Sequence, residues 1–178
     1  MRDISNDTEL KSIFEAQLKQ VIDSISERIL NVLLDYIRKD VYDNNEPTTY
    51  ERTWQFLNSW INQVETSANT GEVIAEIFSD SSRMDYIPEK GIHGSREYGD
   101  IRDQLSYAIE TGTMYSYRKI RKDRSWNPAA KKRRFFQDTI SELDKRGQIW
   151  KWFEEEMRSR GIAVEKGGST SLTPSGEY

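Results

Sequence analysis

The longest regular pattern in the chain is an amphipathic helical stripe between Thr8 and Lys39. Large apolar residues recur there every three or four positions, as on one face of an α-helix. They are Leu10, Phe14, Leu18, Val21, Ile25, Ile29, Val32 and Tyr36, with Ile13, Ile22, Leu33 and Ile37 widening the stripe. Pro47 ends the pattern within the sequence DNNEP, because proline disfavours helical geometry in the residue before it. Such a helix is roughly 45 Å long. This exceeds the usual width of a domain of this size, so we expect part of it to pack on something outside its own domain.

A β-hairpin is predicted between Ser59 and Asp80. The segments WINQVETS and GEVIAEIF are short and rich in β-branched and aromatic residues, and the turn-prone sequence ANTG separates them. Just before the hairpin, apolar residues at helical spacing predict a helical turn. They are Tyr50, Trp54, Leu57 and Ile61.

The segment after the hairpin, SDSSRMDYIPEKGIHGSREYGD, contains turn-forming residues and little periodicity, so we expect a long exposed loop. A short helix is predicted from about Gly99 to Thr111, with Gly112 as its end.

A second long helix is predicted from about Ala129 to Arg160, weakened or bent in its middle by Gly147. Its inner side is expected to carry Phe136, Ile140, Leu143, Trp150, Phe153 and Met157. Gly161 suits the left-handed position that ends a helix, Ile162 can make the accompanying hydrophobic contact, and IAV could add a short strand.

The length of 178 residues suits one domain, which we place at residues 1–165, followed by a flexible Gly/Ser/Thr-rich tail at 166–178. Hydrophobic residues make up only 35% of the chain and charged residues 31%, so much of its surface must be solvated or meet polar partners. Aromatic residues reach 11%. These rings are consistent both with assembly through aromatic surfaces and with a small core built from rings.

The net charge of −4 argues against a protein whose whole surface coats nucleic acid. The absence of cysteine excludes disulfides, cysteine-ligated zinc and a thiol nucleophile, and is compatible with a reducing cytoplasm. There is no signal-peptide pattern at the start and no apolar run near 18 residues. We therefore expect a soluble protein that is neither secreted by a signal peptide nor membrane-spanning.

The signals for catalysis are weak. His93 is the only histidine, and Glu97, Asp100 and Asp103 follow it. A hydrolytic metal site normally gathers three or more well-placed ligands, and a single histidine among loop carboxylates is more often a turn or cap element. Ser95 lacks the glycine-flanked pattern of a nucleophile, and no phosphate-binding glycine motif occurs. We expect neither an enzyme nor a bound cofactor or metal.

The strongest charge feature is the basic segment, YRKIRKDRSWNPAAKKRRFF. It holds nine cations against a single acid, Asp123: Arg118, Lys119, Arg121, Lys122, Arg124, Lys131, Lys132, Arg133 and Arg134. Basic groups interleaved with aromatic rings can hold a phosphate backbone and stack bases, which favours DNA contact. The same composition is typical of protein interfaces, and acidic stretches such as EEEM, on the same chain or on a neighbouring copy, could pair with it. We favour subunit contact over DNA contact.

The junction YDNNEPTTYERTWQFLNSW resembles a YxxYxPxxYxRTxxLLxS segment of small neck and tail-completion proteins of tailed bacteriophages and prophages. The matching positions are Tyr42, Pro47, Tyr50, Arg52, Thr53, Leu57 and Ser59, whereas Asn45 replaces a tyrosine and Phe56 a leucine. We expect Tyr50 and Trp54, within the junction, to pack on the apolar stripe of the long helix. The segments HGS, GDIRDQLSYAIETG and RGIAV resemble the same group in order and spacing, so the resemblance covers about residues 10–164.

The resemblance implies an α+β fold with a long N-terminal helix, a small antiparallel sheet with a hairpin, a short helix and a long C-terminal helix. It implies a structural virion protein of the neck or tail, made in the host cytoplasm. Such proteins form rings, often of six or twelve copies, between the portal or its adaptor and the tail, around the channel through which DNA leaves. The partners implied are further copies of the chain, portal, adaptor or tail proteins, and DNA without sequence specificity.

Overall fold

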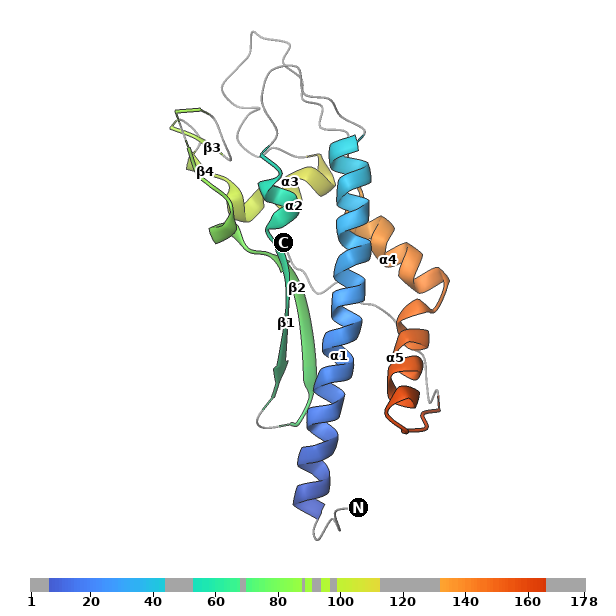
Figure 1. The fold of residues 1–178 in the computed structure, drawn as a ribbon. Coiled ribbons are helices and arrows are strands. Elements are labelled where there is room, and N and C mark those ends of the chain that lie inside the picture. Colours follow the sequence, from blue (N-terminus) through green and yellow to red (C-terminus); the bar gives the residue numbers. More distant parts are fainter. Residues whose placement is uncertain are drawn as a thin grey trace. The chain divides into compact units, whose positions relative to one another are not determined.

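A computed structural model describes residues 7–43, 53–67, 70–87, 89–90, 94–96, 99–112 and 132–165, and the fold is α+β as predicted (Figure 1). The helices are α1 (Asp7–Ile37), α2 (Gln55–Asn58), α3 (Leu105–Thr111), α4 (Phe135–Lys145) and α5 (Gln148–Ser159). A π-helical segment, Arg38–Asp43, continues α1, and 3₁₀ turns occupy Ser81–Arg83 and Arg102–Gln104. Two antiparallel ladders form, one from β1 (Trp60–Thr66) and β2 (Val73–Ser79), the other from β3 (Gly94–Ser95) and β4 (Gly99–Asp100).

The chain divides into two compact units. Unit 1 comprises Met1–Asn31, Asn62–Ile77 and Ile140–Tyr178, and unit 2 comprises Val32–Ile61 and Phe78–Thr139. Both units draw on α1, on the β1–β2 hairpin and on α4, because the division passes through these elements.

The core of unit 1 lies between the first part of α1 and α5. Val21, Ile25 and Met157 are almost fully buried there. Partly buried apolar residues pack around them, namely Ile29, Ile149, Trp152, Phe153, Ile162 and Val164. The stripe that the sequence predicts on α1 is thus used as a core face at this level of the helix.

Glu156 holds α5 on α1 by polar contacts at the edge of this core. One of its carboxylate oxygens accepts from Arg28 at 2.7 Å and from Ser24 at 3.0 Å, and the other accepts from Arg160 at 2.7 Å. The hydrogen bonds from Arg160 and Ser24, with the nearby charge of Arg28, hold the pKa of Glu156 below its usual value. The Arg28 guanidinium also lies 5.8 Å from the centre of the Trp152 ring. These pairings show that α5 runs antiparallel to α1.

The β1–β2 hairpin lies on another side of α1 (Figure 1). Asn62 donates from its side chain to the buried Ser26 hydroxyl at 2.9 Å. At the turn, Gly71 has a left-handed φ of 71°, and a Cβ there would lie 2.8 Å from the Glu15 carboxylate. Glycine is therefore favoured at this position by its backbone angle, and a side chain there would also have to displace the flexible end of the Glu15 side chain.

The core of unit 2 is built around three aromatic rings. Phe56, Trp60 and Phe135 are each at most 8% exposed, and every pair of their ring centres is 5.9 Å apart at an edge-to-face angle. Edge-to-face contact is a favoured arrangement of aromatic pairs because the ring edge is positive and the face negative. Further buried apolar residues complete the core, namely Leu33, Ile37, Val41, Tyr42, Leu57 and Met84.

The predicted long C-terminal helix is wrong in its extent. The described part begins at Phe135, and Gly147, with a φ of 54°, breaks it into α4 and α5. The sequence placed Phe136 on the inner side, but Phe135 is the ring that is buried, at 1% exposure. Gly161 ends α5 in the left-handed conformation as predicted, and the Ile162 N–H donates to Met157 O at 3.0 Å. The predicted IAV strand is wrong, because residues 162–165 form none.

Two further boundaries differ from the prediction. The helix expected from Gly99 begins as a 3₁₀ turn at Arg102 and becomes α3 only at Leu105, although it ends at Gly112 as expected. The expected loop after the hairpin contains a 3₁₀ turn and the β3–β4 ladder. Arg102 stabilises this region because its guanidinium donates to Met84 O at 2.7 Å and contacts the Asp100 carboxylate at 2.7 Å.

We predict that Phe135→Ala lowers the free energy of unfolding by about 3–5 kcal/mol, since it leaves a cavity among buried rings. Urea unfolding monitored by circular dichroism measures the change. The matched control is Phe136→Ala, whose side chain is half-buried, so its cost should be clearly smaller. Equal costs for the two substitutions would contradict this assignment of the core.

Candidate functional site

Two rings of the aromatic junction form a stacked pair in unit 2. Tyr42 and Trp54 have their ring centres 4.4 Å apart and their planes within 11°. The Tyr42 hydroxyl accepts from the backbone N–H of Leu57 at 3.3 Å, which connects the end of the π-helical segment to α2. The junction thus brings together two residues that are separated by twelve positions.

Trp54 adopts an unusual backbone conformation for this contact. Its φ of 58° and ψ of 4° lie in the left-handed region, and it is the only non-glycine residue with positive φ in the described part of the chain. This conformation costs a non-glycine residue about 1–3 kcal/mol and persists only where the surrounding structure enforces it. The residue remains 41% exposed, so the stack leaves part of Trp54 available to a neighbour.

The other junction residues divide between buried positions and undescribed ones. Leu57 is buried. The buried Ser59 hydroxyl lies 2.8 Å from the Ser79 hydroxyl, where Ser59 directly precedes β1 and Ser79 ends β2. Pro47, Tyr50 and Arg52 lie outside the described residues. The described residues of the junction thus have a structural role, because they connect the π-helical segment to α2. Trp54 stacks on Tyr42, which lies three positions after the predicted end of the helix at Lys39, so its observed ring partner is not one of the predicted stripe residues.

The structure describes three of the nine cations of the basic segment. Lys132 and Arg134 are exposed, whereas Arg133 is half-buried. The Arg133 guanidinium donates to Val41 O at 3.5 Å, and its backbone N–H donates to Ile109 O at 3.2 Å. The other six cations lie outside the described residues: Arg118, Lys119, Arg121, Lys122, Arg124 and Lys131. The three described cations therefore differ in role, one being internal and two available at the surface.

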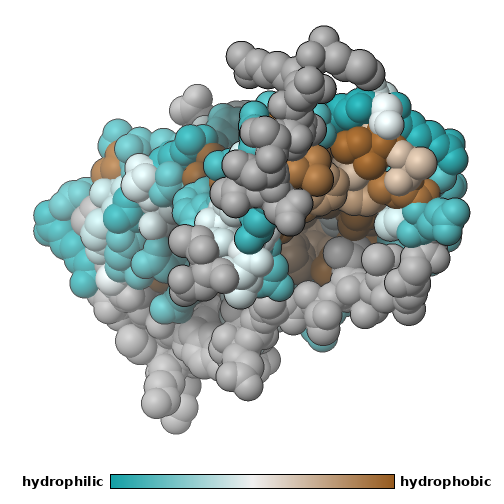
Figure 2. Space-filling view, turned by 90° about the horizontal axis from the view of Figure 1, so that it is seen from below, coloured by the Kyte–Doolittle hydropathy of each residue, from teal (hydrophilic) through white to brown (hydrophobic). Residues whose placement is uncertain are grey.

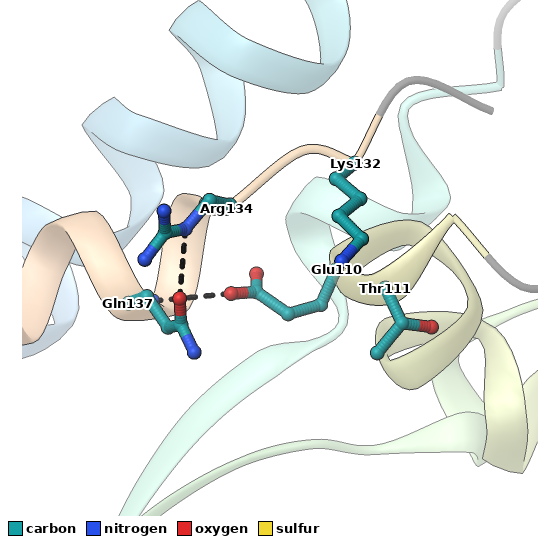
Figure 3. Close-up of a pocket in the computed structure, with 5 residues that line it drawn as sticks. All are labelled: Glu110, Thr111, Lys132, Arg134 and Gln137. Atoms are coloured by element: carbon teal, nitrogen blue, oxygen red, sulfur yellow. Dashed lines mark hydrogen bonds between the residues drawn. The ribbon is translucent and has the colours of Figure 1, made fainter.

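A pocket lies where the basic segment enters α4 (Figure 3). Its lining residues come from the end of α3 and from the start of α4: Glu110, Thr111, Lys132, Arg134 and Gln137. The Glu110 carboxylate accepts from the backbone N–H groups of Phe136 at 3.0 Å and Gln137 at 3.2 Å. Both N–H groups belong to the first turn of α4, which has no helical acceptors for them, so Glu110 caps this helix from a distance.

Burial raises the pKa of the Glu110 carboxyl, although the hydrogen bonds from Phe136 and Gln137 act in the opposite direction. The charge of Asp138 also raises this pKa, while that of Arg134 lowers it. The positive end of the helix is thus already occupied by a carboxylate of the chain itself. Glu110 therefore acts as a structural cap of α4, and two cations, Lys132 and Arg134, line the same pocket. The sequence did not indicate this cap, because Glu110 and α4 are far apart along the chain.

A second carboxyl in unit 2 lies in the π-helical segment. One oxygen of Asp40 is buried, and the described residues supply no hydrogen-bond partner for it. Burial raises the pKa of Asp40, the charge of Lys39 lowers it, and the charge of Asp138 raises it. π-helical turns are frequent at functional positions. No periodicity in the sequence indicated either the π-helical turn or this buried oxygen.

Large apolar side chains reach the surface in both units, and Figure 2 shows hydrophobic side chains exposed on one face. In unit 1 they are Leu10 (52% exposed), Ile13 (40%), Phe14 (45%) and Ile74 (50%). In unit 2 they are Trp54 (41%) and Phe78 (37%). Single exposed apolar residues are normal, but a group of them marks an interaction surface. Leu10, Ile13 and Phe14 form such a group within two turns of α1.

His93 lies outside the described residues, so the weak catalytic hypothesis attached to it stays untested. In the described part of the chain, no group of three or more His, Asp or Glu side chains could hold a metal ion. None of the described helices is long and apolar enough to cross a membrane.

We predict that Glu110→Ala destabilises the protein by about 1 kcal/mol, the typical cost of removing a helix cap. Thermal unfolding measures this change. The control is Glu142→Ala, which removes a partly exposed ion pair with Arg146, just after the end of α4, and is expected to cost less. Because the folded-state pKa of Glu110 is raised, its contribution to stability is present below the ordinary pKa and is lost as pH rises through the raised one. Glu110→Gln should abolish that part of the pH dependence. An unchanged pH profile would contradict the assignment.

Comparison with known proteins gives one informative match. The profile of the YomN family matches residues 6–159, which is most of the chain. No curated protein and no solved structure matches it. The matched range includes the junction, the hairpin and both C-terminal helices. The chain therefore belongs to YomN, a phage-derived family.

Proposed function

We propose that this protein is a structural virion protein that joins the phage head to the tail. The observation that carries the proposal is membership of a phage-derived family over residues 6–159. Its junction resembles that of neck and tail-completion proteins, which supports a role at the neck or tail. In this proposal the protein is made in the host cytoplasm and resides in the neck or tail. It acts by assembly and not by catalysis.

The proposed assembly is a ring, of six or twelve copies, around the DNA channel and in contact with portal, adaptor or tail proteins. Features of each unit support an assembling protein. The exposed apolar group on α1 in unit 1 offers a surface to a neighbour. In unit 2, the exposed Trp54 is held rigidly on Tyr42. A pre-ordered aromatic side chain loses little conformational entropy on binding, which suits an interface anchor.

We predict that phage particles made without this protein have full heads that lack tails or that leak DNA. Negative-stain electron microscopy of a deletion lysate shows the particles directly, and supplying the gene in trans should restore them. A deletion that yields normal, infectious particles would exclude the proposal.

DNA contact by the basic segment is the second candidate, favoured by the exposure of Lys132 and Arg134 on either side of an internal Arg133. Two exposed cations close together along the chain can each neutralise a DNA phosphate. It is compatible with the first proposal, because a ring around the channel also faces DNA.

We predict that Lys132→Ala combined with Arg134→Ala weakens binding to duplex DNA and reduces the slope of log affinity against log salt by about two. Arg133→Ala is the matched control. Its guanidinium faces Val41 O, so it should change stability more than the salt slope. Fluorescence anisotropy across a salt series measures both effects, and an absence of binding at low salt would remove the DNA hypothesis.

A further inference from the structure

The face of α1 that receives α5 continues toward the N-terminus beyond the reach of α5. Within unit 1, α5 contacts α1 at Val21, Ser24, Ile25 and Arg28. Residues three, four, seven or eleven positions apart share a helix face. Leu10 and Phe14 therefore lie on the face of Val21 and Ile25, with Ile13 beside them.

The N-terminal part of this face is exposed, whereas the part about three turns further along α1 is buried. Leu10, Ile13 and Phe14 are 40–52% exposed, against 0% for Val21 and 4% for Ile25. The hairpin does not compete for this face, because its turn approaches α1 at Glu15. The apolar stripe is thus one continuous surface, of which the chain's own α5 covers only the later part.

We propose that a second copy of this chain covers the exposed part of the stripe with its own Leu10, Ile13 and Phe14, the two α1 helices running antiparallel. The α1 helix of the second copy would pack along the first turns of α1, just as α5 packs along the following turns. Like α5, it would run antiparallel to α1. The contact is therefore continuous with the α1–α5 interface of unit 1.

The composition of the chain favours a second copy over its own terminal segments. Residues 166–178 contain only Leu172 and Tyr178 as large apolar residues, six positions apart. Residues 1–6 contain only Met1 and Ile4. By contrast, the first turns of another α1 present three large apolar side chains on one helical face, at the spacing of the stripe to be covered.

The stripe also complements itself in an antiparallel pair. If the twofold axis passes near Ser12, Leu10 of each copy lies opposite Phe14 of the other. The contact then consists of two equivalent layers, and in each layer a Phe14 side chain packs on a smaller Leu10 side chain. Such a contact uses the same patch on both copies and closes as a pair. Three side chains per copy form a small interface, so the pair is weak and concentration-dependent. It does not rest on the ring proposal: a pair of this kind closes on itself, so a ring would need a further contact on another face of the chain.

Sedimentation velocity of the full chain over a concentration series tests the pairing. We expect reversible dimers for the wild type and a rise of at least about ten-fold in the dissociation constant for Phe14→Ser or Leu10→Ser. The matched control is Ile74→Ser, a similarly exposed apolar side chain in the same unit, which should leave the dissociation constant unchanged. Circular dichroism would verify that each variant keeps its helix content. A monomer at every concentration, or a dimer that only Ile74→Ser weakens, would overturn the proposal.

Cross-linking tests the register independently, since the chain has no cysteine. A mixture of Leu10→Cys and Phe14→Cys copies should form a disulfide-linked heterodimer under mild oxidation, in excess over the homodimers of either variant. A mixture of Leu10→Cys and Ile74→Cys copies is the control and should not. Equal cross-linking in both mixtures would overturn the antiparallel contact.

Sedimentation velocity also distinguishes the case in which the chain's own tail covers the exposed part of the stripe. If the tail covered the stripe, Leu172→Ser with Tyr178→Ser in the full chain would create self-association that the wild type lacks, and the proposal would fail. Head-to-tail joining is measured separately, so failure of the pairing and failure of the proposed function can be told apart. Loss of the pair in Phe14→Ser with normal head-to-tail joining would leave the proposed function standing, whereas tailless particles with an intact pair would support the pairing alone.

Discussion

The structure depends on a single apolar stripe that runs along one long helix. The stripe supplies Val21 and Ile25 to the core of unit 1, and Leu33 and Ile37 to the core of unit 2. The core cluster of unit 1 has few other fully buried side chains, whereas unit 2 adds the rings of Phe56, Trp60 and Phe135. Because the stripe is continuous, the packing face in each unit follows from the helical repeat, and a shift of helical phase would misplace both cores at once. The exposed turns at Leu10 and Phe14 are the part of this stripe that lies before the first core.

Local patterns explain why much of the fold could be predicted from the sequence. The α1 stripe and the alternation of the hairpin are short-range periodicities that each element must satisfy wherever it packs. Gly112 and Gly161 end helices in the left-handed conformation because glycine adopts positive φ without steric cost. The phage association also followed from a local feature, the spacing of residues in the junction, and family membership supports it.

The features that the sequence did not predict depend on contacts between distant residues. The two C-terminal helices look like one because the apolar spacing continues across Gly147, and only the packed structure shows its φ of 54°. Phe135 is chosen over its neighbour Phe136 because it meets Phe56 and Trp60, more than seventy positions earlier. The left-handed Trp54 is similarly set by stacking on Tyr42 and not by any preference of tryptophan for that conformation.

Two carboxylates perform comparable structural tasks but respond to acid in opposite ways. Glu156 accepts from Arg28 and Arg160, so its charge is compensated and its pKa falls. Glu110 accepts only backbone N–H groups in the contacts that hold α4, and burial outweighs them, so its pKa rises. Its ionised form is therefore the less favoured one in the fold, although it is the better acceptor.

Acidification consequently acts on the two contacts at different pH. As pH falls through the raised pKa of Glu110, the proton binds more tightly to the folded state than to the unfolded chain, and that carboxyl adds to stability. The α1–α5 contact behaves in the reverse manner, because the stability that Glu156 contributes is present above its ordinary pKa and is lost as pH falls through its lowered one. The two cases differ in the balance of opposing effects. Around Glu156, the hydrogen bonds from Arg160 and Ser24 outweigh desolvation, whereas around Glu110 desolvation outweighs the two backbone hydrogen bonds and the charge of Arg134.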